Sequence, residues 1–229
     1  MNEVQQVAEV ASKPMSGFLT LKYLGASASV VLSVVAFSNV VQSLFFLWTR
    51  AGSGYGLGSY IFSGYQGMVT NALLTLVFAL IAWLVFINVS KSISARTDYL
   101  NTLAYVLITN AMLGALILIT LLGLVNLVSV LLSSLALIGS GADIGAMYLG
   151  TFLPQLVSSA LAGFATFAAY KIAKGKNLSS ILGIVLISVA GAALIAVIIT
   201  VAVQSHATAS NDQKMKDSVN DYLNSYNSF

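Results

Sequence analysis

The chain contains no cysteine, so a disulfide, a thiolate nucleophile and a cysteine-ligated metal are all excluded. It is also poor in charge: 7% of its 229 residues are charged, against about 25% in a typical soluble domain. The net charge of +3 comes from basic residues that are scattered among short connections rather than clustered, which argues against a nucleic-acid partner.

Catalytic and metal-binding signatures are missing as well. The sequence has no His-Glu-x-x-His motif, no Gly-x-Ser-x-Gly motif and no aspartate pair within an apolar stretch. The single histidine, His206, has no carboxylate or cysteine beside it. Asp143 is the only acid outside the C-terminal tail that the topology predicted from the sequence places on the same side of the membrane. The sequence therefore predicts a protein that is not an enzyme and that has no cofactor and no metal site.

What the chain does contain is five long stretches without a charged residue. A bilayer core about 30 Å thick is crossed by a helix of roughly 20 apolar residues, and each stretch is longer than that. The sequence predicts an all-α bundle of five transmembrane helices in one transmembrane domain over 1–205, followed by a tail over 206–229. The five predicted spans cover about 26–49, 68–90, 101–123, 147–171 and 179–203.

Orientation is predicted from lysine and arginine in the short loops, which favour the cytoplasmic side. With the N-terminus in the cytoplasm, seven basic residues lie inside and three outside. The inner residues are Lys13, Lys22, Lys91, Arg96, Lys171, Lys174 and Lys176; the outer ones are Arg50, Lys214 and Lys216. We therefore expect a multi-pass cell-membrane protein with a cytoplasmic N-terminus and an extracytoplasmic C-terminus.

The region after the third predicted span is apolar for longer than one crossing needs. Asn126, Ser129 and Ser133 recur at helical spacing within 124–139 and form a narrow polar stripe. We expect a short amphipathic helix here, either on the outer surface or half-inserted as a re-entrant piece. A full sixth crossing would place the lysines of 171–176 outside, against the charge rule.

The middle of the chain shows a recognisable order of features. Trp83-Leu84-Val85-Phe86 is followed by a basic turn with Lys91 and Arg96, a long apolar run, and a helix ending at Tyr170-Lys171. Over about residues 17–175 this spacing of hydropathy resembles a family of four-helix bacterial membrane domains of unassigned function, to which helix five and the tail would be additions. The resemblance implies a bacterial inner-membrane protein and supplies no activity, cofactor or site.

Amides within the predicted spans include Asn39, Gln42, Asn110 and Gln155. No carboxylate or histidine lies in the predicted spans, whereas proton pumps and ion-coupled carriers generally need one within the membrane. The amides fit two interpretations. They can bond across helices, which contributes roughly 0.6 kcal/mol per bond on average, or they can line a path for a neutral solute.

The tail has the sharpest pattern outside the membrane. Apolar residues recur there with the heptad spacing 4, 3, 4, 3, at Met215, Val219, Tyr222, Tyr226 and Phe229. We expect a short amphipathic helix that begins at Asn211 or Asp212 as its cap. So short a helix is marginal alone in water, so this seam is predicted to contact a partner protein surface.

The function predicted from these features is that of a non-catalytic structural or accessory subunit of a homo-oligomer or larger membrane complex. Its predicted partners are the lipid bilayer and further membrane subunits, including copies of itself. The alternative is a small channel or transporter for a neutral or hydrophobic solute, lined by Asn39, Gln42, Asn110 and Gln155.

Overall fold

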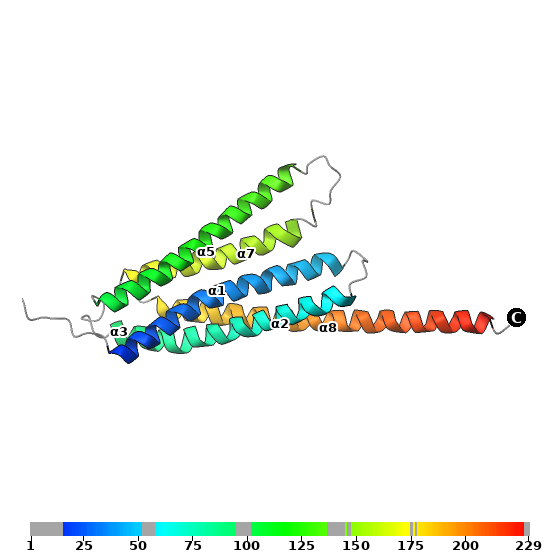
Figure 1. The fold of residues 1–229 in the computed structure, drawn as a ribbon, viewed down its shortest axis with the longest axis horizontal. Helices are drawn as coiled ribbons and strands as arrows, with labels where there is room; N and C mark the ends of the chain where they lie inside the picture. Colours follow the sequence, from blue (N-terminus) through cyan, green and yellow to red (C-terminus); the bar gives the residue numbers. More distant parts are fainter. Residues whose placement is uncertain are drawn as a thin grey trace, which may run out of the picture.

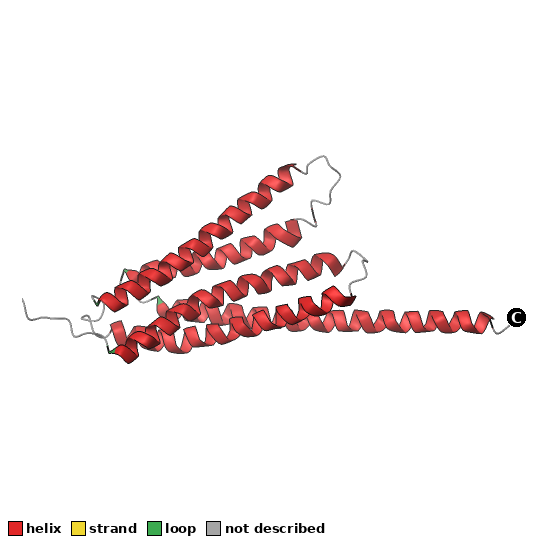
Figure 2. Ribbon diagram, in the orientation of Figure 1, coloured by secondary structure: helices red, strands yellow, loops and turns green. Residues whose placement is uncertain are grey.

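The computed structural model describes residues 16–51, 58–94, 102–136, 145, 148–174, 176 and 178–226. Almost all of these residues are helical and none of them is in a strand (Figure 2). The elements are α1 (Gly17–Ala51), α2 (Gly58–Ile81), the π-helical turn η1 (Ala82–Phe86), α3 (Ile87–Ser94), α5 (Leu103–Ala136), the π-helical turn η2 (Tyr148–Phe152), α7 (Leu153–Ala173) and α8 (Ser179–Tyr226). The predicted all-α class is confirmed.

Five helices are long and apolar enough to cross a membrane, as predicted. The membrane-spanning segments are Gly17–Thr49, Gln66–Val89, Leu103–Leu135, Gly150–Ala173 and Ser179–Val203. They run alternately up and down, so that the start of α1 and the turn between α7 and α8 share one end of the bundle (Figure 1). The far end of α8 lies at the opposite end. This is the architecture of a multi-pass membrane protein.

The first helix begins nine residues earlier than the predicted span because its start is capped. The Ser16 hydroxyl accepts a hydrogen bond from the Leu19 backbone N–H (3.3 Å), which is the usual role of a serine before a first turn. Lys22 is tolerated in this extension because its ammonium lies 4.3 Å from the centroid of the Phe18 ring, near the end of the helix.

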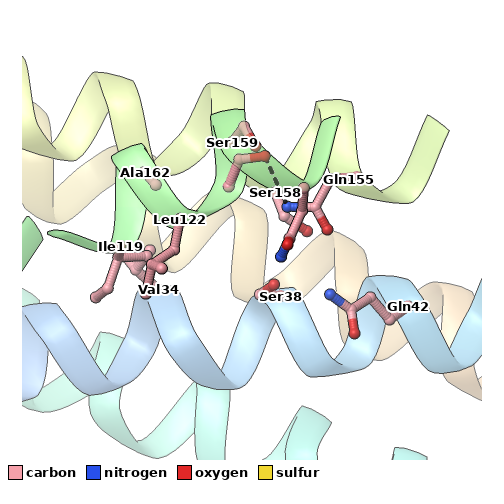
Figure 3. Close-up of a pocket in the computed structure, with 11 residues that line it drawn as sticks. Val34, Ser38, Gln42, Ile119, Leu122, Gln155, Ser158, Ser159 and Ala162 are labelled. Carbon is pink, nitrogen blue, oxygen red and sulfur yellow. Dashed lines mark hydrogen bonds between the residues drawn. The ribbon is translucent and has the colours of Figure 1, made fainter. Parts of the chain in front are cut away.

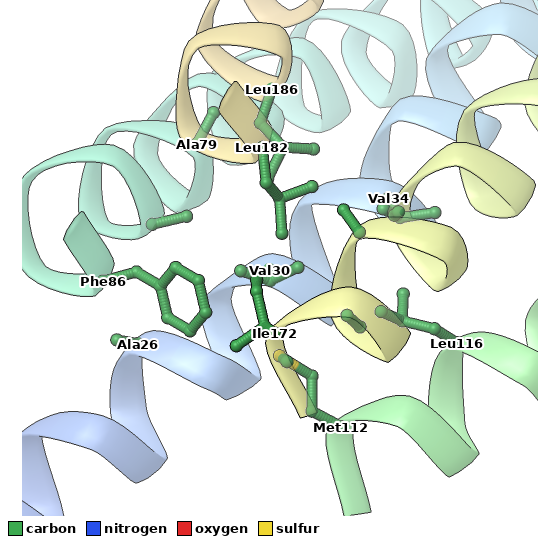
Figure 4. Packing of buried hydrophobic residues seen from close by; sticks show 14 of the residues in the cluster. Ala26, Val30, Val34, Ala79, Phe86, Met112, Leu116, Ile172, Leu182 and Leu186 are labelled. Atoms are coloured by element: carbon green, nitrogen blue, oxygen red, sulfur yellow. The ribbon is translucent and has the colours of Figure 1, made fainter. Parts of the chain in front are cut away.

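α1 lies at the centre of the bundle and contacts α2, α5, α7 and α8, while α5 packs on α7 and α8 packs on α2. The face that α7 turns inward is made mostly of small residues, of which Ala162, Ala165, Ala168 and Ala169 are all buried. They belong to the same apolar cluster as Ile172 of α7, which Figure 4 shows among residues of the other helices. Small side chains let helices approach closely where no hydrophobic effect drives them together. The small residues of α7 are therefore used for packing within the chain.

Near the end of the bundle that holds the start of α1, a group of aromatic residues joins three of the helices. The Tyr23 hydroxyl lies 2.7 Å from the hydroxyl of Thr109, and its ring stacks on those of Tyr105 (5.3 Å between centroids) and Phe86 (6.0 Å). The Tyr105 hydroxyl donates to the carbonyl of Ile172 (3.4 Å). This end of the bundle is thus fixed by polar contacts as well as by apolar packing.

The prediction of a separate outer helix over 124–139 is wrong for the residues that the structure describes. Residues 124–136 continue α5 without a break, and 137–139 lie outside the described residues. No proline interrupts α5, and its C-terminal part stays attached to the bundle: the Ser134 hydroxyl donates to that of Tyr148 (3.4 Å). The polar stripe of this segment lies on an exposed side of α5, where the Ser133 hydroxyl donates to the Ser129 carbonyl one turn back (2.9 Å).

The predicted start of a tail helix at Asn211 or Asp212 is wrong too. α8 runs from Ser179 to Tyr226 as one helix of 48 residues, about 72 Å long against a bilayer core of about 30 Å. Neither proline nor glycine follows Gly191, so nothing in the sequence stops the helix where it leaves the apolar layer. In Figure 1, α8 projects well past the ends of all the other helices.

Candidate binding site between α1, α5 and α7

A cavity of about 170 Å³ lies between α1, α5 and α7, in the half of the bundle where α1 and α5 end and α7 begins (Figure 3). Its lining residues are Val34, Ser38, Gln42, Ile119, Leu122, Gly123, Asn126, Gln155, Ser158, Ser159 and Ala162. A cavity of about 150 Å³ accommodates a molecule the size of benzene, so this one has room for a group of about six heavy atoms.

The lining changes in polarity along the bundle axis. Val34, Ile119 and Ala162 form an apolar end toward the middle of the bundle, and serine hydroxyls line the central part. Three amides line the end that faces the projecting part of α8: Gln42, Asn126 and Gln155. No charged residue is among them, so the cavity is polar at one end, apolar at the other and uncharged throughout.

The close contact between α5 and α7 beside the cavity depends on Gly123. The side-chain amide of Gln155 donates a hydrogen bond to the Gly123 carbonyl (3.2 Å), which is the bond drawn dashed in Figure 3. A Cβ atom added at Gly123 would lie 2.5 Å from the Ser159 Oγ. The absence of a side chain at residue 123 therefore leaves room for the Ser159 hydroxyl where the two helices approach each other. One turn further along, the hydroxyls of Thr120 and Thr166 bond across the same interface (2.9 Å).

Two hydroxyls at the cavity have unused hydrogen-bonding capacity. Ser158 and Ser159 are 5% and 8% exposed, and neither Oγ has a hydrogen-bond partner among the residues described. A buried polar group left in this state costs about 1–3 kcal/mol. Within helices most hydroxyls avoid that cost by donating to a carbonyl one turn back, as Thr166 does to Ala162 (2.8 Å). The two serines do not, which leaves donors and acceptors available to a bound group.

Of the four amides predicted as a lining, the cavity brings together two, Gln42 and Gln155. Asn39 and Asn110 are exposed and lie outside it. Asn110 is thirteen residues before Gly123 along α5, about 20 Å at 1.5 Å per residue, so it cannot pair with Gln155.

The third amide of the cavity, Asn126, was assigned from the sequence to an outer surface helix. The signal that could have found it is its spacing from Gly123 and Ile119, which puts the three residues on one side of a continuous helix. The assumed break near residue 124 hid this pattern.

The predicted seam of the tail lies on α8. The helix includes Met215, Val219, Tyr222 and Tyr226, whereas Phe229 lies outside the described residues. Val219 is 52% exposed. Where α8 leaves the bundle it is held by α1, because the Trp48 indole N–H donates to the hydroxyl of Thr200 (3.0 Å). The seam is thus carried by a helix that is anchored in the bundle.

Within the described part of the chain, no three residues among histidine, cysteine, aspartate and glutamate come together in a way that could hold a metal ion. Comparison with known proteins gives no family model, no curated protein and no solved structure that matches this chain. The resemblance to four-helix bacterial membrane domains therefore stays a prediction from hydropathy.

Proposed function

We propose that the protein is a non-catalytic structural or accessory subunit of a membrane complex, and that it associates with copies of itself through the projecting part of α8. The observation that carries this proposal is the continuity of α8 from Leu182, which is fully buried, to the exposed Val219. Residues 201–226 extend about 39 Å beyond Thr200, the last side chain of α8 found buried among the described residues.

The membrane itself favours pairing of these extensions. Copies inserted in one bilayer share one orientation, so their α8 extensions are parallel and begin at the same height. Because the seam residues recur at a mean spacing of 3.5, two parallel helices can bury them against each other as a two-stranded coiled coil. Anchoring also raises the effective concentration of a seam that covers only about two heptads and would pair weakly in solution.

In the proposed arrangement the N-terminus and the turn between α7 and α8 are cytoplasmic, and the α8 extension is extracytoplasmic in a bacterial inner membrane. The distribution of lysines supports this orientation. The ammonium groups of Lys171 and Lys174 lie 5.1 Å from the ring centroid of Phe167 and 5.6 Å from that of Tyr170, at the same end of the bundle as Lys22. Lysines favour the cytoplasmic side of a membrane, whereas aromatic rings are found at both interfaces, so the lysines support this orientation.

A single charge placed in the seam tests self-association. We expect Val219→Glu to lower the dimer fraction at least tenfold, because a carboxylate at a core position of a coiled coil loses its hydration without gaining a partner. Native mass spectrometry of the full chain in mild detergent gives the dimer fraction. The matched control is Ser218→Glu, which adds the same charge to an exposed neighbour off the seam. A monomeric parent, or equal dimer fractions in the two variants, would contradict the proposal.

A path for a neutral solute is a second candidate, favoured by the amides of Gln42, Asn126 and Gln155 at one end of a cavity. It has the difficulty that Val34, Ile119 and Ala162 form the other end. If the protein conducts glycerol, Gln155→Leu is expected to change the flux into proteoliposomes severalfold, while Asn110→Leu, an exposed amide of α5, leaves it unchanged. Equal flux in the parent and Gln155→Leu would remove this candidate.

A further inference from the structure

The cavity between α1, α5 and α7 has the features of a binding site, and these do not depend on association through α8. Its exposed edge is formed by Gln42 of α1 together with Leu122 and Asn126 of α5. All three lie within membrane-spanning segments, Gly17–Thr49 and Leu103–Leu135. The opening therefore lies between two spanning helices, where a molecule dissolved in the bilayer reaches it from the side.

The chemistry of the lining limits what can bind. A charged group would have to give up its hydration with no opposite charge among the lining residues, so an ion is excluded. A purely apolar group would leave the hydroxyls of Ser158 and Ser159 without partners. The amides and hydroxyls offer both donors and acceptors, and a hydroxyl group uses both kinds of partner at once.

The order of the lining also fixes how a ligand lies. Gln42 and Gln155 lie at the end nearer the membrane surface, while Val34 and Ile119 lie toward the middle of the bundle. Asn126 lines the same polar end, because it follows Ile119 by two turns of α5. A molecule with an uncharged polar end and an apolar remainder matches this gradient when its polar end points to the surface, as lipid headgroups do. Leu118 and Val125, exposed side chains on one face of α5, provide an apolar surface for the remainder.

We propose that this cavity binds the uncharged polyol end of an amphiphile, such as the glycerol group of a neutral lipid. The amides of Gln155 and Asn126 and the two serine hydroxyls recognise its hydroxyls, and the chain leaves between α1 and α5. The room of about 170 Å³ fits a glycerol-sized group and excludes a large headgroup. The same polyol chemistry is found in free glycerol, from which the experiment must distinguish the lipid.

The probe is a monoacylglycerol with a diazirine in its acyl chain, added to phosphatidylcholine nanodiscs that hold the full-length protein. After illumination, labelled residues are mapped by peptide mass spectrometry. We expect labelling to concentrate near Val34, Ile119 and Leu122 and to be competed by unlabelled monoacylglycerol. Competition by free glycerol as well identifies a site for any polyol, whereas competition by monoacylglycerol alone identifies a lipid site.

Variants decide whether the polar lining recognises the probe. Gln155→Leu and Ser158→Ala are each expected to raise the concentration of unlabelled monoacylglycerol that halves the labelling. The expected rise is roughly five- to tenfold, the usual effect of one lost hydrogen bond. Asn110→Leu and Ser133→Ala alter exposed polar residues of α5 outside the cavity and are expected to change nothing. Circular dichroism and gel filtration establish whether each variant is folded. If Gln155→Leu does not fold, the milder substitution Ser158→Ala still tests the proposal.

Three results would overturn the proposal. The first is even labelling along the exposed face of α5, at Leu107 as much as at Leu122, in parent and variants alike. The second is that anionic phosphatidylglycerol, which carries the same glycerol group beside a charge, competes as well as unlabelled monoacylglycerol does. The third is absence of competable labelling. Val219→Glu separates this proposal from self-association, because it is expected to lose the dimer and keep the labelling.

Discussion

Replacing Gly123 by leucine is expected to cost about 3 kcal/mol of the free energy of unfolding, at the upper end of the usual range for overpacking. A Cβ atom at this position already lies 2.5 Å from the Ser159 Oγ, so the longer side chain must push α7 away from α5. That movement also breaks the hydrogen bond from Gln155 to the Gly123 carbonyl. Reversible unfolding in mixed micelles, followed by circular dichroism, measures the loss.

Two further substitutions make the test specific for this contact. Gly123→Ala is expected to cost about 1 kcal/mol, and adding Ser159→Ala should recover most of that, since the Ser159 Cβ is 3.4 Å away, an ordinary contact distance. Gly114→Ala is the control on the same helix, because a Cβ there meets nothing within 4 Å. The account fails if Gly114→Ala and Gly123→Ala destabilise equally, or if the second substitution recovers nothing.

The second large effect is expected from single cysteines, which the cysteine-free chain allows without any background. Ala173→Cys at the end of α7 and Ser218→Cys on the α8 extension are both exposed positions. We expect a membrane-impermeant maleimide to label Ser218→Cys fully in intact cells and Ala173→Cys not at all, with the reverse in inverted vesicles. The reason is that the spanning segment Ser179–Val203 separates the two positions, and that the proposed orientation puts the lysine-rich end in the cytoplasm.

The buried Ala165→Cys serves as the control and should react only after denaturation. Labelling of Ala173→Cys and Ser218→Cys from one common side would rule out five crossings. A complete exchange of the two patterns would keep the five crossings and reverse the orientation.

The number of spans could be predicted from the sequence because the cost of burying charge in hydrocarbon leaves its mark on the chain directly. Helix ends could not be predicted as well. The early start of α1 depends on a single hydroxyl, that of Ser16, and the tolerance for Lys22 depends on the neighbouring Phe18 ring. Such local contacts change hydropathy very little.

The two largest differences, at α5 and α8, have a common cause. Both predictions assumed that a helix ends where its apolar run or its membrane crossing ends. Helices end where the backbone is interrupted, and neither segment contains a proline. Reading past residue 124 as one helix would have placed Asn126 beside Gly123 and revealed the third amide of the cavity. Gln42 and Gln155, two of the four amides named from the sequence, do line the cavity.

The unbroken α8 also has a mechanical consequence. A straight helix resists bending over its whole length. A molecule bound at the far end of α8, near Tyr226, is therefore kept at a fixed distance from the bilayer. The same rigidity works in reverse. A tilt or twist applied at that end acts as a lever on the hydrogen bond between Trp48 and Thr200, and through α1 on the helix that supplies Gln42. A force applied to α8 outside the membrane would in this way alter the cavity within it, and with it the binding of a molecule there.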